Sequence, residues 1–159
     1  MKTLATLFIL FISTITVAQS TIQLSDYDIL HNTEWKGTLT YKDYTSGKLQ
    51  DVETLLQVEI KGDKIISDIQ YTYEPKKNNR SKVKISEDGL FYGNEKVVSN
   101  TFENGVRTIK TTFQGKDNNI KATFYKTYTF SSTEFQIKKE VQYEDGEPFT
   151  RNIYNFKKQ

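Results

Sequence analysis

The sequence predicts an all-β protein, a single antiparallel meander barrel of eight to ten strands preceded by a short helical turn. From Trp35 to Lys157, apolar and polar residues alternate in runs of strand length, and turn residues separate the runs. The chain contains 10 Tyr and 10 Phe but only 2 Pro, which is typical of β-structure. Short successive connections favour an up-and-down barrel over a Greek-key sandwich, because closing the sheet removes its exposed edges.

The first 18 residues are predicted to be a signal peptide. Lys2 supplies a positive start, residues 4–17 form an apolar core, and Thr16, Val17 and Ala18 are small residues at a cleavage site before Gln19. No cysteine follows this site, so a lipoprotein is not expected. We therefore expect an exported soluble protein, periplasmic or secreted, with a retained N-terminal membrane anchor as the alternative.

Residues 19–33 are predicted to form an N-terminal segment that covers one end of the barrel. Tyr27, Ile29 and Leu30 have the spacing of one helical turn, with Ser25 or Asp26 as its cap. The barrel domain itself is expected over residues 34–159.

Strands and turns are predicted in the following order along the barrel domain. In its first half we expect a strand over residues 35–42, a turn over 43–48, a strand over 52–60, a tight turn at Gly62-Asp63, a strand over 65–73 ended by Pro75, a basic loop over 76–80, a short strand around Val83 and Ile85, and a turn over 87–89. In its second half we expect at least one strand within 90–102, interrupted or bulged at Gly93, a hairpin turn at Asn104-Gly105, a strand carrying Ile109 and Phe113, a turn over 115–119, strands over 120–130 and 135–143, a turn over 144–148, and a last strand over 149–157 of uncertain register.

Composition excludes several classes of protein. The chain has no cysteine, so its stability must come from burial rather than from disulfides. The formal charge is +2, and removing Lys2 with the signal leaves +1, so neither nucleic acid nor an anionic membrane is expected as a partner. An outer-membrane barrel is also excluded, because lysines on the predicted outer face would each cost roughly 2–4 kcal/mol at mid-bilayer. These lysines are Lys36, Lys42, Lys61, Lys121 and Lys138.

Trp35, Gly37 and Arg151 form a pattern that resembles the lipocalin-like (calycin) barrels. In that superfamily a short turn precedes the first strand, a Trp with a nearby Gly begins it, and a basic side chain from the last strand lies across the Trp. Here the order is Trp35-Lys36-Gly37, the reverse of the usual order, and no flanking helix is evident in the sequence. The resemblance implies a lipocalin-like barrel in which these three residues are structural and Arg151 packs on Trp35.

Basic residues share strand faces with apolar residues in the C-terminal half. Arg107 is in phase with Ile109, Lys126 with Phe124, Lys139 with Ile137, and Arg151 with Phe149 and Ile153. Acids appear only on the opposite phase, at Glu59, Asp68, Glu134 and Glu140. Because burying an unpaired cation costs several kcal/mol, this pattern predicts an interior that binds an anionic or apolar amphiphile. Its anionic group would lie on Arg107, Lys126, Lys139 or Arg151, with hydroxyls from Tyr71, Tyr128 or Tyr143, and its tail on Leu56, Val58, Ile69 and Phe124.

Two other functions stay open at this point. The barrel could be packed solid and serve as an interaction or structural module, since one bulge reverses every later side chain. An isomerase or cyclase is the third class, with Tyr128 and Lys126 as acid and base, although no catalytic motif appears. We predict no cofactor and no metal site, because His31 is the only histidine and the acids Glu144, Asp145 and Glu147 lie in a turn. A binding function requires a pocket of roughly 300 Å³ or more, lined by at least two of the four basic residues.

Overall fold

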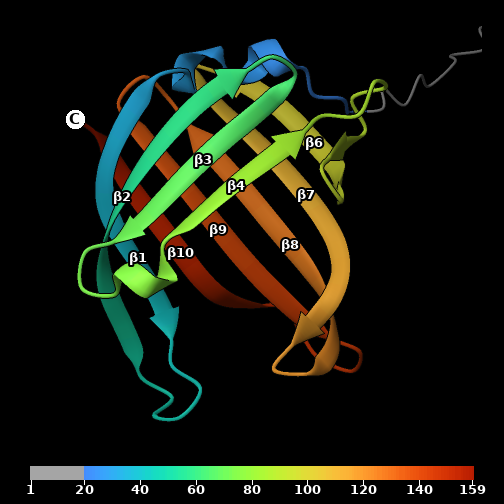
Figure 1. The fold of residues 1–159 in the computed structure, drawn as a ribbon. Coiled ribbons are helices and arrows are strands. Elements are labelled where there is room, and N and C mark those ends of the chain that lie inside the picture. Colours follow the sequence, from blue (N-terminus) through green and yellow to red (C-terminus); the bar gives the residue numbers. More distant parts are fainter. Residues whose placement is uncertain (1–19) are drawn as a thin grey trace, which may run out of the picture.

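The computed structural model describes residues 20–159, so the predicted signal peptide lies outside the described residues. Within them the chain forms one antiparallel sheet that curves into a nearly closed barrel (Figure 1). The elements are η1 (Leu24–Leu30), β1 (Thr33–Lys42), β2 (Leu49–Lys61), β3 (Lys64–Tyr71), η2 (Pro75–Lys77), β4 (Asn79–Lys84), β5 (Phe91–Tyr92), β6 (Glu95–Glu103), β7 (Val106–Asp117), β8 (Ile120–Phe130), β9 (Glu134–Tyr143) and β10 (Phe149–Lys158). η1 and η2 are 3-10 helices, and neither of these described helices is long and apolar enough to cross a membrane.

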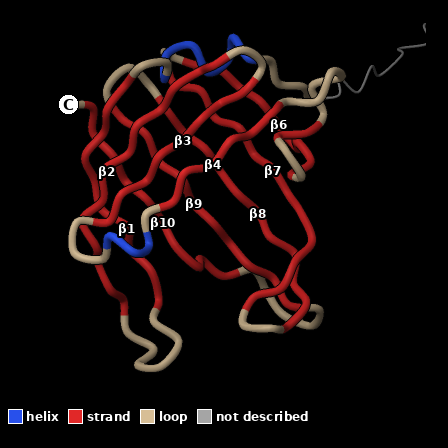
Figure 2. Tube along the Cα trace, viewed as in Figure 1, coloured by secondary structure: helices blue, strands red, loops and turns tan. Residues whose placement is uncertain are grey.

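The strand order confirms the predicted meander and the predicted fold class. Each strand pairs with its neighbour in sequence, apart from β4 and β5, which are the two edges of the sheet. The first and last strands, β1 and β10, also pair with each other along their length. A single bridge between Ile85 and Tyr92 joins the two edges. η1 lies across one end of the barrel and η2 lies near the other (Figure 2).

Two asparagine turns fix the register of the central strands. Asn104 and Gly105 have φ angles of 52° and 79°, which confirms the predicted hairpin between β6 and β7. The next turn is at Asn118 and Asn119, with φ angles of 48° and 66°. The predicted start of this turn at Gly115 is wrong, because β7 continues to Asp117 and Gly115 lies within it.

Other predicted boundaries shift by a few residues. The third strand ends at Tyr71 rather than Tyr73, and much of the predicted basic loop belongs to η2 and β4. Gly93, with a φ of 63°, lies in a turn between β5 and β6, so two strands occupy the region where at least one was expected. The short helical turn is confirmed, but its N-cap is Gln23, whose backbone N–H donates to Asp26 Oδ2 at 2.9 Å.

The last strand contains a bulge that reverses its inner face. The pairing of β10 with β9 shifts between Thr150 and Asn152, so Tyr154 and Phe156 face the core beyond it. Ile153 instead pairs opposite Thr40 and Lys138 on the outer phase. The predicted common phase of Arg151 and Ile153 is therefore wrong.

The barrel interior has one solid end. Beneath η1, Tyr27 stacks on Tyr92 with ring centroids 5.5 Å apart, and Trp35 packs edge-on against Phe135 at 5.9 Å. Leu56 and many other apolar side chains fill this cluster, whereas a smaller cluster around Phe124 occupies the far end. Close packing of this kind is typical of a filled core rather than of a ligand cavity.

The predicted packing of Arg151 on Trp35 is wrong. The β10 partner of Trp35 is Lys158, and Arg151 lies toward the other end of the strand, with its guanidinium 3.7 Å from the Tyr44 ring centroid. Gly37 has a structural role, because a Cβ at this position would overlap the carbonyl oxygen of Asn155 and push β1 away from β10.

Candidate ligand-binding site

A pocket of about 320 Å³ opens at the end of the barrel remote from η1. The inner faces of β1, β2 and β3 form one wall, and β9 and β10 form the other. The connection through η2 contributes Glu74 and Lys77 to its mouth. The pocket has the expected size and is lined by two of the four predicted basic residues. Its lining residues are Leu39, Tyr41, Val52, Tyr71, Glu74, Lys77, Lys139, Arg151 and Asn152.

Strand alternation and the β10 bulge position these side chains. Leu39 and Tyr41 on β1 and Val52 on β2 share the inward phase of the buried Trp35 and Leu56. The bulge in β10 brings the adjacent residues Arg151 and Asn152 to the same pocket, where strict alternation would separate them.

Tyr71, which lines the pocket, is hydrogen-bonded to Tyr154 on β10. The hydroxyls of Tyr71 and Tyr154 are 2.8 Å apart and share a hydrogen bond. Burial raises the pKa of Tyr154, and the hydrogen bond to Tyr71 adds to the shift. Tyr154 therefore stays neutral at physiological pH and can donate or accept a hydrogen bond.

Lys139 is a cation of the pocket that projects from the inner face of β9. Among residues 20–159, no carboxylate lies within ion-pair distance of its ammonium group. Its Nζ lies 5.6 Å from the centroid of the Phe124 ring. Burial lowers the pKa of Lys139, Asp117 opposes the shift, and the positive charges of Lys126 and Arg151 add to it.

Arg151 forms an ion pair with Asp117 at the end of the barrel remote from η1. Its Nε lies 3.5 Å from Asp117 Oδ1, and its Nη1 donates to the carbonyl oxygen of Lys42. Asp117 is buried and also accepts hydrogen bonds from the hydroxyls of Tyr143, at 2.9 Å, and Tyr44. Tyr143 therefore has a partner within the protein and does not line the pocket. Arg151 also lines a neighbouring pocket of about 340 Å³, together with Tyr44 and Phe149.

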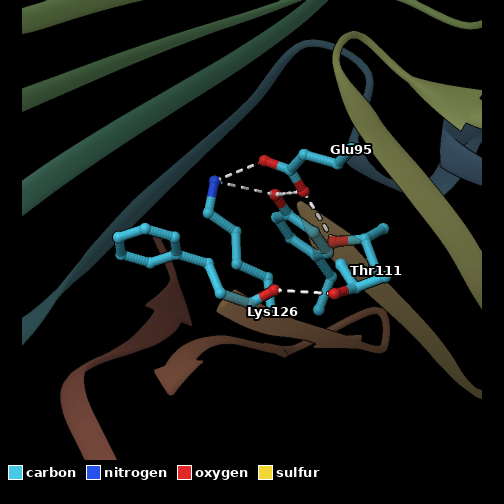
Figure 3. A network of polar contacts seen from close by, with 6 residues as sticks. Glu95, Thr111 and Lys126 are labelled. Atoms are coloured by element: carbon cyan, nitrogen blue, oxygen red, sulfur yellow. Dashed lines mark hydrogen bonds and ion pairs between the residues drawn. The ribbon is translucent and has the colours of Figure 1, made fainter. Parts of the chain in front are cut away.

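Lys126 and Tyr128 belong to a buried network around Glu95 (Figure 3). Lys126 Nζ lies 2.5 Å from Glu95 Oε1, while the hydroxyls of Thr111 and Tyr128 donate to Oε2 at 2.6 and 2.9 Å. Burial, reinforced by the charge of Glu95, raises the pKa of Tyr128 well above its usual value. Each polar group in this network has a partner, which is typical of a structural role.

Arg107 lies at the opposite end of the barrel, below η1. Its Nη1 forms an ion pair with Asp26 Oδ1 at 3.1 Å and donates to Asn100 Oδ1 at 2.8 Å. Its guanidinium also lies 5.0 Å from the Phe102 ring centroid. Of the predicted ligand residues, the structure thus brings together Lys139, Arg151 and Tyr71, and it places Arg107, Lys126, Tyr128 and Tyr143 elsewhere.

Three acids inside the barrel were missed, and the expectation that acids face only outward is wrong. Asp26, Glu95 and Asp117 neutralise Arg107, Lys126 and Arg151. Glu95 is in phase with the buried Val97, and Asp117 is in phase with Phe113. Strand alternation would therefore have placed both acids on the inner face if β6 had been predicted to begin at Glu95 and β7 to end at Asp117.

The predicted tail site is also corrected. Leu56 and Val58 are 1% and 2% exposed within the solid core, so they cannot contact a bound molecule. The apolar wall open to the pocket is formed by Leu39 and Val52 instead.

These features define a class of structure, an antiparallel meander barrel with one solid end and a basic pocket at the other. No family model matches the chain, and no curated protein matches it. Within residues 20–159 there is no cluster of three or more His, Cys, Asp or Glu side chains that could hold a metal ion.

Proposed function

We propose that this protein binds a small amphiphilic molecule carrying one carboxylate or phosphate group in the pocket between β1–β3 and β9–β10. The observation that supports the proposal is the balance of charge inside the barrel. Four cations, Arg107, Lys126, Lys139 and Arg151, face three acids, and each acid is paired with one cation. Among the described residues this leaves Lys139 unbalanced, and an anion in the pocket would neutralise it.

The pocket surroundings favour an anion over a neutral ligand. Lys77 at the mouth adds a second cation, and Glu74 is the acid that also lines the pocket. The ligand's anionic group would lie on Lys139 and Lys77, near Arg151, and its short apolar part on Leu39 and Val52. A pocket of about 320 Å³ is near the lower limit for ligand sites, so a short amphiphile fits better than a long-chain lipid.

The proposal includes an exported role, for which residues 1–18 are the support. Membership of the lipocalin-like barrels likewise stays a prediction. The meander and Gly37 agree with it, whereas Arg151 packs on Tyr44 and not on Trp35.

Titration calorimetry with octanoate and with octanol tests the proposal. The protein is expected to bind octanoate, and octanol at least ten times more weakly, because a charge-assisted hydrogen bond contributes roughly 1.5–3 kcal/mol. Lys139→Met and Lys77→Met should each weaken octanoate binding by about tenfold, on the same principle. The matched control is Lys138→Met, since Lys138 lies on the outer face of the same strand and pairs with Glu140 at 2.7 Å.

Two results would overturn the proposal: no binding of octanoate by the wild-type protein, or equal binding by Lys139→Met. Native mass spectrometry of the protein purified from its own host, with organic extraction, would then be expected to find it empty. That outcome would favour a solid interaction module instead.

A further inference from the structure

We infer that Lys139 captures carbonyl compounds, so that the ligand of this pocket is a small aldehyde or ketone that also carries an anionic group. The inference rests on the proposed function and narrows its ligand class. It would give the protein a reversible covalent mode of binding in addition to a purely ionic one.

The first observation is that Lys139 is held differently from a typical surface lysine. Lys138, the next residue, has its ammonium 2.7 Å from Glu140 on the outer face of the barrel. Lys139 faces inward to the pocket, above the Phe124 ring and beyond ion-pair distance of any carboxylate in residues 20–159. An amine without an acid partner is not held in its protonated form by a salt bridge, and it is free to approach a bound molecule.

The second observation is that cations surround this amine on neighbouring strands. Lys126 on β8 and Asn152 on β10 are its Cα partners, and Arg151 precedes Asn152. Burial is the main cause that lowers the pKa of Lys139, and Asp117 on β7 opposes this shift. The charges of Lys126 and Arg151 add smaller contributions in the same direction as burial.

The remaining polar groups near the amine come from the mouth of the pocket. Glu74 precedes η2, Lys77 is its last residue, and Tyr41 and Tyr71 belong to β1 and β3. The charges of Glu74 and Lys77 oppose one another, and the two tyrosines contribute hydroxyl groups. A larger fraction of Lys139 is therefore unprotonated than of a solvated lysine, and only the unprotonated amine attacks a carbonyl.

The proposed step is an imine condensation. The nitrogen lone pair of Lys139 attacks the carbonyl carbon, the C–N bond forms as the C=O π bond breaks, and one proton moves from the nitrogen to the oxygen to give a carbinolamine. The C–O bond then breaks, the oxygen leaves as water with the second nitrogen proton, and the C=N bond forms without any oxidant or reductant. The ligand's carboxylate or phosphate would lie on Lys77 and Arg151, and a protonated imine would lie over the Phe124 ring, which attracts cations.

Pyridoxal 5′-phosphate is a suitable probe, because it carries one aldehyde and one phosphate and its imine absorbs visible light. The full protein would be incubated with the probe near neutral pH, reduced with borohydride, which adds hydride to C=N, and digested for peptide mass spectrometry. Lys139 is expected to be labelled at least ten times faster than Lys138. Pyridoxal, which lacks the phosphate, should label it more slowly, and octanoate should slow labelling by competition.

Two variants make the test specific. Lys139→Arg keeps a positive charge but forms no borohydride-reducible imine, so the rapid absorbance change should disappear. Lys138→Arg should leave labelling of Lys139 unchanged. Urea unfolding followed by Trp35 fluorescence shows whether each variant is folded.

The outcomes separate this inference from the proposed function. Octanoate binding together with labelling spread evenly over the lysines would overturn the carbonyl inference and leave anion binding intact. Rapid labelling of Lys139 without octanoate binding would overturn the proposed function. Labelling that octanoate does not slow would show that the two ligands do not share one pocket, and would also overturn the inference.

Discussion

Replacing Glu95 by alanine tests whether the buried network between β6 and β8 stabilises the barrel. The Glu95 side chain is 8% exposed and accepts hydrogen bonds from Lys126, Thr111 and Tyr128. Removing one member of a buried ion pair costs roughly 3–5 kcal/mol, because the other charge is left unpaired. The Lys126 side chain is 26% exposed, so water can reach its ammonium, and we expect a loss near the lower limit, about 3 kcal/mol. For a domain of this size the loss lowers Tm by about 10 °C.

Urea unfolding followed by tryptophan fluorescence measures this loss, since Trp35 is the single tryptophan and is 1% exposed. Glu95→Ala should cost about 2 kcal/mol less when Lys126→Met is already present, because no ammonium is then left unpaired. Glu103→Ala, at an exposed position of the same strand, is the control and should change stability by less than about 0.5 kcal/mol. A coupling free energy below about 0.5 kcal/mol would refute the reasoning that the ion pair, rather than packing, carries the effect.

Two further predictions concern barrel closure and alkaline pH. Gly37→Ala should destabilise the protein by about 3 kcal/mol, because the added Cβ overlaps the carbonyl oxygen of Asn155. The neighbouring Thr38→Ala is the control and should have little effect. Equal urea-unfolding midpoints for the two variants would contradict the prediction. Burial raises the pKa of Tyr92 and Tyr128, so the unfolded chain ionises these groups first as pH rises above 10. Their contribution is complete below pH 10, and each then loses roughly 1.4 kcal/mol per pH unit up to its raised native pKa. The free energy of unfolding, measured from pH 8 to pH 11, should fall in this way. Tyr92→Phe should remove the part of the loss that is due to Tyr92. An equal free energy of unfolding at pH 8 and pH 11 would exclude the effect.

The sequence predicted most of the fold because alternation of apolar and polar residues directly indicates strands. In residues 120–130 every second residue is apolar or aromatic except Lys126, and β8 has these bounds. The errors lie where local chemistry gives the wrong signal. Gly115 is typical of a turn, yet it lies within β7 because a Cβ there would be 2.8 Å from Cε2 of Phe124, so the glycine makes room for this ring. The bulge at residues 150–152 has no comparable signal, and it reversed the predicted phase of Ile153.

The candidate site was predicted only in part, for a related reason. The phase of each basic side chain within its own strand follows from local alternation, and Lys126 and Lys139 do face inward. Their acid partners depend on contacts across the barrel. Glu95 on β6 meets Lys126 on β8, and Asp117 on β7 meets Arg151 on β10, so neither pair joins adjacent strands. Contacts of this kind depend on the curvature and closure of the sheet, which the sequence pattern does not describe.

The contrast between Lys126 and Lys139 supports the proposed binding role of position 139. The two lysines are Cα partners on β8 and β9 and face the same interior, but Glu95 balances only Lys126. An inward cation without an acid costs free energy on folding, and burial lowers the pKa of Lys139 accordingly. A methionine at this position would fill similar space without that cost, so packing alone gives no reason for a lysine there. The unpaired charge of Lys139 lies at the pocket. A charged, accessible group that lowers the stability of a protein is typical of a site that contacts a ligand.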